Sequence, residues 1–464
     1  MVFSSKEFLF IFMPAFFAVY LSVPKRFKNG VLLLGSLLFY LFGTLSHPLH
    51  FAVFIACVFA DWAFGRLMCR FKGKAKLFLS VSVILHLANL AFFKYIPFAV
   101  NQVAEFLPFV PFMSEAVLPI GISFYTFQGI SYLADVARGK TEAEKNPIDY
   151  FVYISMFEQL IAGPIVTYQE VKDSIHDRKI TAGDVIRGLE IFSFGLGFKV
   201  LLANPVGKLW TQLATIGYES VSTPLAWLGI FAFTFQIYFD FYGYSLMAIG
   251  LGKMLGFNIP KNFDDPYTSA TMTEFWRRWH ITLGSWFREY VYIPLGGNRK
   301  GNAATIRNML IVWLLTGIWH GAGYNYILWG LILFLIMLPE KLLWGDFLSR
   351  HRLLGRACMT VIVPLTWAVF AIEDMGQLGI FFTRLFPFFG QGPWSVFRYD
   401  YLKYLGEYWY FLLAGALFSC RFPYKASKKI KCEPIRIAAA VMVFAFSAYF
   451  VYRGANDPFL YYRF

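Results

Sequence analysis

Long apolar runs recur from one end of the 464-residue chain to the other, and they constrain its fold more than any other feature. The runs are about 15 to 25 residues long, close to the roughly 20 that a helix needs to cross the hydrocarbon core of a bilayer. Hydrophobic residues make up 58% of the chain and charged residues only 15%, whereas soluble domains are about half apolar and a quarter charged. The sequence therefore predicts an all-α, multi-pass helical membrane protein.

The positions of the runs predict about ten to twelve crossings. Spans are expected near 8–23, 29–44, 50–65, 77–93, 117–134, 186–203, 225–252, 309–338, 357–372, 405–420 and 437–453. The run 150–168 is expected to be a re-entrant element, because the dipeptide Gly163-Pro164 breaks it and a full crossing would place the basic segment 253–307 outside. No internal repeat, linker or long loop divides the chain, so residues 1–464 are expected to form one membrane domain.

Basic residues are clustered in short segments between the apolar runs, and the net charge of the chain is +14. The clusters are Lys25 to Lys28, Arg66 to Lys76, Lys253 to Arg307, Lys341 to Arg356 and Arg421 to Arg436. The positive-inside rule places them all in the cytoplasm and the N-terminus outside. This explains the charge better than nucleic-acid binding, because no soluble face carries it, and no nucleic-acid partner is expected.

Two further features limit the possible functions. The first apolar run, Phe8 to Val23, lacks a basic start and a small-residue cleavage site, so we interpret it as an uncleaved first span. The cysteines show no CxxC or metal-ligand spacing, and each lies in or beside an apolar run; they are Cys57, Cys69, Cys358, Cys420 and Cys432. Neither a disulfide framework nor a metal site is therefore expected.

Residues 271–300 are the most informative stretch, because a single helix would sort their side chains onto two faces. The apolar face would carry Trp276, Trp279, His280, Leu283 and Phe287, and the polar face Glu274, Arg277, Arg278, Ser285 and Arg288. Thr273 is expected to cap this helix and Pro294, followed by two glycines, to end it. The plain interpretation is an interfacial helix with arginines among the lipid headgroups. His280 favours a functional role for this stretch over a purely interfacial one. A histidine on the apolar side points into protein, where polar groups need partners.

His320 lies in the stretch Thr-Gly-Ile-Trp-His-Gly-Ala-Gly at 316–323. If a helix begins near Met309, about 1.5 Å per residue places His320 roughly 16 Å along it, near the bilayer midplane. An ionisable side chain at that depth is a functional-site hypothesis, and the neighbouring glycines allow close approach of a substrate or another backbone. The alternative is a neutral histidine that hydrogen-bonds a neighbouring helix.

Asp240 is a third candidate, since Gln236, Asp240 and Tyr244 lie one helical turn apart within an apolar run. Such a polar stripe must face protein or a water-filled cavity. Asp240 could orient a catalytic histidine, or the stripe could be purely structural. Nothing in the sequence pairs these residues directly.

Several motifs resemble one known family. They are Trp-Arg-Arg-Trp-His at 276–280, Tyr-Ile-Pro-Leu-Gly-Gly-Asn-Arg at 292–299 and Gly-Ile-Trp-His-Gly at 317–321. Together they resemble the membrane-bound O-acyltransferases (MBOAT). The opening Met-Val-Phe-Ser-Ser, Leu-Pro-Ile-Gly-Ile-Ser-Phe-Tyr at 118–125 and Leu-Ile-Ala-Gly-Pro-Ile at 160–165 resemble the bacterial alginate O-acetylation branch, which is related to D-alanyl transfer proteins. The resemblance covers residues 1 to 345 and continues to the C-terminus only by hydropathy.

The resemblance implies a helical bundle with re-entrant and interfacial helices around a central tunnel, in the bacterial cytoplasmic (inner) membrane. It implies a catalytic His320 and a second functional histidine, His280. It also implies acetyl-CoA as donor with no permanently bound cofactor, and an extracytoplasmic hydrolase-fold (SGNH-type) partner that acetylates a polysaccharide. Two departures from the branch are Glu158 before Gln159, in place of Pro, and Leu246 in place of Asp.

The expected chemistry is transfer of an acyl group from a thioester to oxygen, which needs a base near neutral pH. His320 could be that base, or it could carry the acetyl group as a nucleophile. Substrate contacts are expected from Arg277, Arg278, Arg288, Asn298, Arg299, Trp319 and Asp240. Arginines suit the phosphates of coenzyme A, and they suit lipid headgroups equally well.

Other functions remain open at this stage. Buried histidines and a carboxylate in a helical bundle also suit a proton-coupled transporter or flippase, although inverted repeats are not visible. A scaffold role would leave His320 without a task. The sequence does not name the polysaccharide, and peptidoglycan acetylation or D-alanyl transfer remain alternatives.

Overall fold

The structure is a computed structural model that describes residues 2–107, 109–113, 117–160, 163–389, 396–420, 432–454 and 460. These residues form helices and turns, with no strand among them, and the polytopic helical fold expected from the sequence is confirmed. The contacts divide the chain into two compact units. Unit 1 contains Met1–Phe192, Ser245–Lys261 and Arg288–Tyr290, and unit 2 contains Ser193–Tyr244, Asn262–Phe287 and Val291–Phe464. The expectation of a single domain stays a prediction.

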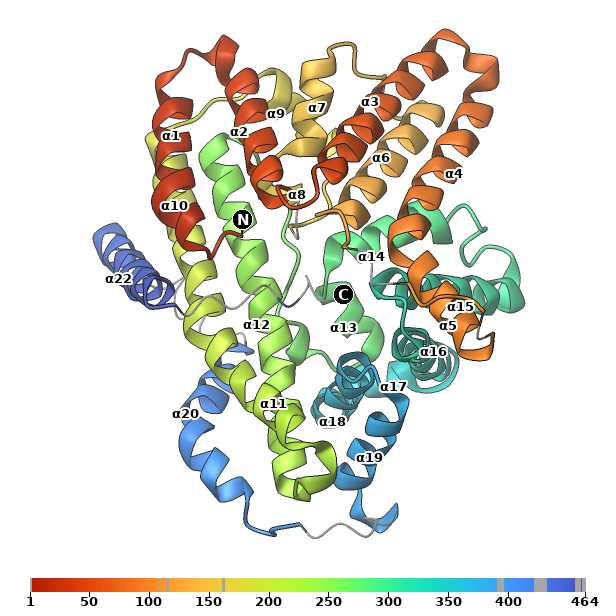
Figure 1. The fold of residues 1–464 in the computed structure, drawn as a ribbon, viewed down its shortest axis with the longest axis vertical. Coiled ribbons are helices and arrows are strands. Elements are labelled where there is room, and N and C mark those ends of the chain that lie inside the picture. The colour runs from red at the N-terminus through yellow and green to blue at the C-terminus, as the bar shows by residue number, and fades with distance from the viewer. Residues whose placement is uncertain are drawn as a thin grey trace. The chain divides into compact units, whose positions relative to one another are not determined.

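Unit 1 contains the N-terminal helices. They are α1 (Met13–Ser22), α2 (Lys28–Gly43), α3 (Pro48–Arg70), α4 (Ala75–Lys94), α5 (Ile96–Phe106), α6 (Ile122–Ala137), α7 (Pro147–Ser155), α8 (Phe157–Leu160), α9 (Tyr168–His176) and most of α10 (Ala182–Gly197), with the short turns η1 (Phe8–Phe12), η2 (Lys25–Phe27) and η3 (Lys72–Lys74). Helices α3, α4 and α6 pack side by side (Figure 1). One polar contact between α3 and α4 is the pair of His86 Nε2 and Asp61 Oδ1, which lie 2.7 Å apart. Gly129 makes room for it, because a Cβ there would lie 2.4 Å from Asp61 Oδ2.

Unit 2 contains most of the long helix α12 (Thr223–Leu255) and the helices that follow it. They are α11 (Asn204–Ile216), α13 (Met272–Arg278), α14 (Ile281–Phe287), α15 (Gly301–His320), α16 (Tyr324–Pro339), α17 (Gly345–Arg350), α18 (Arg352–Ala371), α19 (Met375–Leu385), α20 (Tyr401–Phe418) and α22 (Glu433–Tyr452), with the turns η4 (Phe198–Ala203), η5 (Tyr218–Ser220), η6 (Pro266–Thr268), η7 (Arg288–Tyr292, in part), η8 (Glu340–Trp344) and η9 (Pro387–Phe389). Helices α15 and α16 form a tight hairpin in which Gly317 and Gly330 bring the two backbones into contact.

Six described helical segments are long and apolar enough to cross a membrane: Pro48–Arg70, Lys72–Lys94, Thr223–Leu255, Tyr324–Arg350, Arg352–Ala371 and Glu433–Tyr452. The expected single span 309–338 is wrong, because it is divided into two helices: α15 ends at His320 and α16 begins at Tyr324. The remaining expected spans are largely helical, but they are shorter or less apolar. The total of ten to twelve crossings therefore stays a prediction. The run 150–168 is not one helix: α7 ends at Ser155, α8 covers Phe157–Leu160, and residues 163–167 lie outside any helix. The helix is thus interrupted at Met156 and again at Gly163 and Pro164, and the re-entrant path stays a prediction.

The stretch 271–300 differs from the expected single helix. Helix α13 ends at Arg278, Trp279 is extended, and His280 has a left-handed backbone with φ 46° before α14 begins. The prediction of one amphipathic helix carrying His280 was therefore wrong. The predicted cap was also misplaced, because Thr271, and not Thr273, accepts a hydrogen bond from the backbone N of Glu274. Pro294 does lie beyond the last turn, as expected.

The depth estimate for His320 also changes. Helix α15 begins at Gly301, eight residues before Met309, and has 20 residues. At about 1.5 Å per residue it carries His320 about 30 Å along its axis, rather than 16 Å. The position of His320 at the bilayer midplane stays a prediction.

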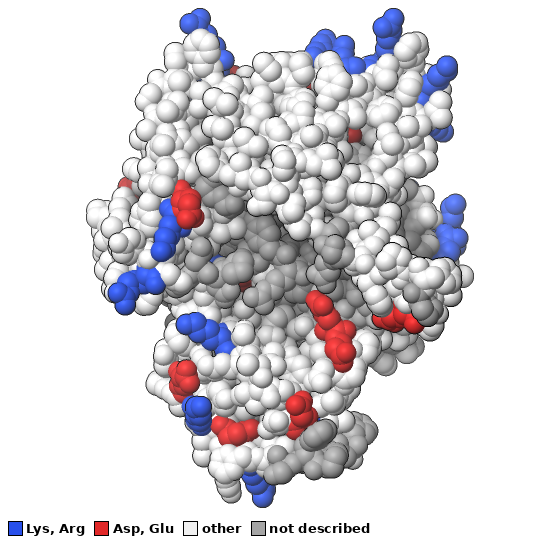
Figure 2. All heavy atoms as spheres, in the orientation of Figure 1, with Lys and Arg blue, Asp and Glu red and all other residues white. Residues whose placement is uncertain are grey.

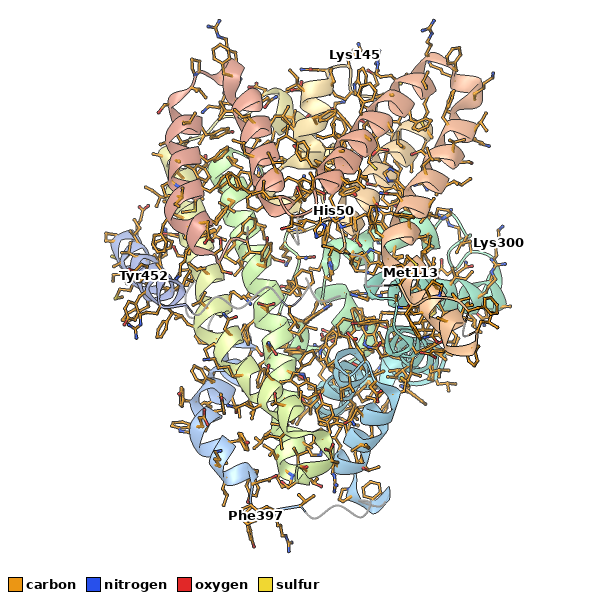
Figure 3. All side chains as sticks on the ribbon, viewed as in Figure 1. His50, Met113, Lys145, Lys300, Phe397 and Tyr452 are labelled. Atoms are coloured by element: carbon orange, nitrogen blue, oxygen red, sulfur yellow. The ribbon has the colours of Figure 1, made fainter. Side chains whose placement is uncertain are left out.

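Basic side chains gather at one end of unit 1. The α1–α2 connection with Lys25 and the α3–α4 connection with Lys72 both lie at this end in Figure 1, and Figure 2 shows Lys and Arg side chains there. Figure 3 labels Lys145 at the same end and His50 near the opposite end of α3. Within unit 1, the expectation that these clusters share one side of the membrane agrees with this arrangement. The cluster Arg421 to Arg436 lies mostly outside the described residues.

Candidate active site

His280 occupies a break that the loop after α12 holds in place. The backbone N of Ile281 donates to Asn262 O at 2.9 Å, and the backbone N of Thr282 donates to Asn262 Oδ1 at 3.3 Å. His280 Nδ1 lies 3.1 Å from the same Oδ1. Because a backbone N–H faces this atom, it is the amide oxygen, and Nδ1 must donate to it. Nε2 of His280 is then left as an acceptor.

Burial decides the charge of His280. The side chain is buried, and this removal from water lowers the pKa of the ring to about 3. The histidine is therefore neutral, and its Nε2 has no hydrogen-bond partner among the described residues. A buried polar atom without a partner is uncommon and often marks a place where a ligand or water binds. The edge of Phe241 packs on the ring, with centroids 4.7 Å apart.

His320 is the last residue of α15 and lies within a set of aromatic rings. Its ring centroid is 4.8 Å from that of Trp319, 5.2 Å from that of Trp329 and 5.2 Å from that of Phe370. The chain turns sharply after it, and only glycine fits at 321, because a Cβ there would lie 2.1 Å from the ring of Tyr326. The glycine-flanked position therefore aims the histidine into the protein, as the sequence predicts.

Aromatic rings form most of the lining of a cavity of about 20 Å³ in unit 2. It is lined by Ile237, Asp240, Phe241, Trp276, Trp279, His320, Trp329, Trp367, Phe370 and Leu460. A volume of this size holds about one water molecule. Two ionisable groups, His320 and Asp240, face it, so the structure brings two of the predicted site residues to one small, mostly apolar space.

His280 and Trp319 lie beside this cavity but do not line it. The rings of His280 and Trp319 are 6.3 Å apart, and Trp319 also contacts His320. Trp319 therefore lies between the two histidines. The functional roles of His280 and His320 stay predictions.

Asp240 has a partner that sequence reasoning missed. Lys199 Nζ lies 2.5 Å from Asp240 Oδ1, and both side chains are buried. Asp240 Oδ2 also accepts a hydrogen bond from the backbone N of Leu460 at 2.7 Å. Gly243 allows the helices to meet, because a Cβ there would lie 2.6 Å from Gly195 O. A signal existed: Lys199 is an ionisable residue inside an expected span, as Asp240 is.

The predicted arginines do not reach the cavity. Arg278 forms an ion pair of 2.6 Å with Glu274 and donates to Thr268 Oγ1, so it holds its own helix in place. Arg277, Arg288, Asn298 and Arg299 are exposed. None of these five residues lines the cavity. Their role in binding phosphates stays a prediction.

Other site residues were beyond the reach of the sequence. Asn262 lies 18 residues before His280 in an ordinary loop, and its role follows only from its contacts. Trp329, Trp367 and Phe370 lie in or beside apolar runs, and nothing in the sequence marks them as site residues. The described residues contain no group of three or more His, Cys, Asp or Glu that could hold a metal ion.

Comparison with known proteins identifies the family. The model of the membrane-bound O-acyltransferase family matches residues 144–347, which include His280 and His320. The chain is 40% identical over 380 residues to the probable alginate O-acetylase AlgI of Pseudomonas aeruginosa, covering 80% of this chain and 69% of that protein. It is 34% identical over 394 residues to the peptidoglycan O-acetyltransferase of Helicobacter pylori, covering 77% and 71%.

A more distant relative is the teichoic acid D-alanyltransferase of Bacillus subtilis, at 27% identity over 302 residues, which covers 62% of this chain and 74% of that protein. All three names describe acyl transfer. The resemblance seen in the motifs is thus confirmed over most of the chain: this multi-pass membrane protein is an acyltransferase that belongs to the membrane-bound O-acyltransferase family.

Proposed function

We propose that this protein takes an acetyl group from a thioester donor at the cytoplasmic face and passes it across the membrane for O-acetylation of an exported polysaccharide. The proposal is supported by relatives that are named alginate O-acetylases, at 37–40% identity over 80–85% of this chain. The donor is acetyl-CoA, and the protein lies in the bacterial inner membrane. An extracytoplasmic hydrolase-fold enzyme of the SGNH type receives the acetyl group and esterifies the sugar.

One observation carries the assignment of the site: His320 and Asp240 face a small cavity that is lined mostly by aromatic rings. Transfer breaks the C–S bond of the thioester and forms a C–O bond, while the proton of the accepting hydroxyl moves to a base and then to the leaving thiolate. A histidine is suited to hold that proton near neutral pH. The apolar rings exclude water, which would otherwise hydrolyse the thioester.

His280 has a different part in this proposal. Because the ring is neutral and its Nδ1 donates to Asn262, its Nε2 is able only to accept a hydrogen bond, and the side chain carries no positive charge. We assign it to binding or positioning a donor group or a water near Trp319. His320 is the residue that takes part in the acyl-transfer step.

The test is His320→Ala in the native host. Acetyl ester content of the polymer should fall to the level of a deletion strain, while the variant stays in the membrane at the normal level. His351→Ala is the matched control, because His351 is exposed and lies outside the cavity. Retained acetylation in His320→Ala would remove this residue from the chemistry.

A second measurement identifies the acceptor. Ester-linked acetate is quantified separately in exported polysaccharide and in peptidoglycan, because one relative is named for each. Loss only from the polysaccharide supports the proposal, and loss only from peptidoglycan contradicts it.

Incubation of purified protein with radiolabelled acetyl-CoA distinguishes the two chemical roles of His320, acetyl carrier and base. Only a carrier leaves label on the peptide that contains His320.

A further inference from the structure

Unit 1 has an apolar groove between α1 and α2 that the proposed function does not use. The groove has a volume of about 620 Å³ and is lined by Glu7, Ile11, Phe12, Ala15, Phe16, Val19, Val31, Leu34, Gly35, Leu38 and Phe42. The helices touch where Phe16 packs on Gly35, since a Cβ at Gly35 would lie 2.4 Å from that ring. The side chains around this contact are exposed: Ile11 is 68% exposed and Leu34 is 61% exposed. In a membrane protein such a groove faces lipid.

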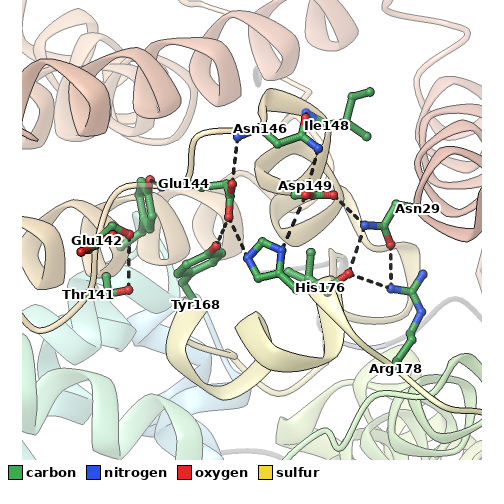
Figure 4. A network of polar contacts seen from close by, with 12 residues as sticks. Asn29, Thr141, Glu142, Glu144, Asn146, Ile148, Asp149, Tyr168, His176 and Arg178 are labelled. Carbon is green, nitrogen blue, oxygen red and sulfur yellow. Dashed lines mark hydrogen bonds and ion pairs between the residues drawn. The ribbon is translucent and has the colours of Figure 1, made fainter. Parts of the chain in front are cut away.

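A basic cavity lies at the end of these two helices. Its volume is about 680 Å³, and its lining includes Lys25, Arg26, Lys28, His176 and Arg178. Figure 4 shows one wall of the cavity, where the side chain of Asn29 forms hydrogen bonds with Asp149 and Arg178. Asn29 Nδ2 donates to Asp149 Oδ1 at 2.6 Å, and Arg178 Nη1 donates to Asn29 Oδ1 at 2.6 Å. The wall is therefore held by charged hydrogen bonds within unit 1.

Lys28 joins the cavity to the groove. On α2, residues 28, 31, 35 and 38 lie on one helix face, so Lys28 stands above Val31 and Gly35. Its Nζ donates to the backbone O of Tyr20 at 2.8 Å, one turn beyond Phe16 on α1. Lys28, which lines the basic cavity, therefore lies one helical turn from Val31, which lines the groove.

The cations of the cavity exceed its carboxylates. Lys25 pairs with Asp177, and Asp149 is bound by Asn29 and Asn146. In the described part of the chain, Arg26 and Lys28 have no carboxylate partner. Burial and the neighbouring charge of Arg178 lower the pKa of Lys28, which indicates repulsion between these cations. A bound anion would relieve it.

We propose that α1, α2 and the basic cavity bind one anionic phospholipid, with its phosphate beside Arg26 and Lys28 and an acyl chain in the groove. Basic pockets next to apolar helices recognise anionic lipid headgroups in this way. A soluble phosphate compound would use the cations but leave the groove empty, so the lipid accounts for both features. The site is independent of the acetyl-transfer site in unit 2.

The experiment is native mass spectrometry of the purified full chain with phosphatidylglycerol or phosphatidylcholine of equal chain length. Wild-type protein should retain one phosphatidylglycerol under conditions that remove phosphatidylcholine. The variant Arg26→Gln/Lys28→Gln should weaken phosphatidylglycerol binding about tenfold. Each cation near a lipid phosphate raises the affinity by a factor on the order of ten or less. Lys72→Gln/Lys74→Gln is the matched control at the same end of unit 1, outside the cavity.

A second pair of variants tests the groove without changing charge. Leu34→Trp fills the groove and should weaken phosphatidylglycerol binding, whereas Ile84→Trp on an equally exposed face of α4 should not. Three results would each overturn the proposal: equal loss in the Lys72→Gln/Lys74→Gln control, equal retention of both lipids, or displacement of the lipid by inorganic phosphate or coenzyme A.

Discussion

Lys199 and Asp240 are both buried, so each depends on the other for its charge. Their atoms lie 2.5 Å apart beside the cavity that contains His320. A buried pair adds little net stability over apolar residues, but removal of one partner leaves an uncompensated charge. The pair is therefore better explained as a device that holds Asp240 in position at the cavity than as a source of stability.

The first residue-scale prediction follows from this. Lys199→Met should destabilise the protein by about 3–5 kcal/mol and lower acetylation, because Asp240 loses its counter-charge. The double variant Lys199→Met/Asp240→Leu should recover most of the stability and none of the activity. The measurement is thermal unfolding of the detergent-solubilised protein, with size-exclusion chromatography used to monitor the loss of folded protein. A double variant as unstable as the single one would contradict the explanation.

The second residue-scale prediction concerns His280. Its backbone has a left-handed conformation, which asparagine tolerates better than most residues do. His280→Asn should fold normally and transfer acetyl more slowly. Because the pKa of His280 is about 3, the ring is neutral from pH 5 to 8 and binds no proton there. The shape of the pH–rate profile in that range should therefore be the same in the variant, with only its height reduced. A shift of the acid limb would show that His280 titrates.

At this scale the sequence predicted two residues that the structure brings to one cavity, His320 and Asp240, and missed their surroundings. His320 and Asp240 were found because ionisable residues are costly in a membrane and must face protein or a cavity. The same rule applies to Lys199, but composition does not say which two buried charges meet. Partners such as Asn262 are set by tertiary contacts that leave no local pattern.

At the scale of elements, the short helix α13 depends on a residue far along the chain. Both carboxylate oxygens of Glu340 accept backbone hydrogen bonds at its start, from Met272 N at 2.7 Å and Thr273 N at 2.8 Å. Glu340 is buried and lies at the end of the α16 segment. It ties α13, and so the break at His280, to the hairpin that carries His320.

Glu340→Gln should therefore reduce acetylation severalfold and destabilise the protein by about 1–3 kcal/mol, because one backbone N–H loses its charged acceptor. Asp346→Asn, six residues further along and exposed, is the control and should behave as wild type. Activity per molecule of membrane-inserted protein is the measurement. Normal activity in Glu340→Gln would mean that α13 holds its place without this contact.

The helix prediction for 271–300 was wrong for a physical reason. The apolar residues of the stretch have helical spacing, and nothing between Arg278 and Ile281 resembles a turn. The break exists because Asn262 supplies acceptors for Ile281 and Thr282, which an isolated segment lacks. By contrast, the helical character of the apolar runs was predicted correctly, since a segment that crosses lipid must satisfy its backbone hydrogen bonds internally.

At the scale of the whole molecule, the basic end of unit 1 is expected to lie on the cytoplasmic side of the membrane. Single cysteines that replace Lys25, Lys72 and Lys145, in a background without native cysteines, should react with membrane-impermeant thiol reagents in inverted vesicles only. Ser46→Cys, in the α2–α3 connection at the other end, should react in right-side-out vesicles only. Reaction of the three basic positions from different sides would contradict the topology.

The glycines that face each other in the α15–α16 hairpin limit how the cavity can open. A Cβ at Gly317 would lie 2.3 Å from Tyr326 O, and one at Gly330 would lie 2.4 Å from Trp313 O. Helices in backbone contact do not slide without losing that fit, so the hairpin moves as one stiff piece. The cavity holds about one water molecule, which is less than an acyl group needs. We therefore expect the side chains around the cavity to rearrange when an acyl group enters, while the hairpin that carries His320 keeps its backbone contacts.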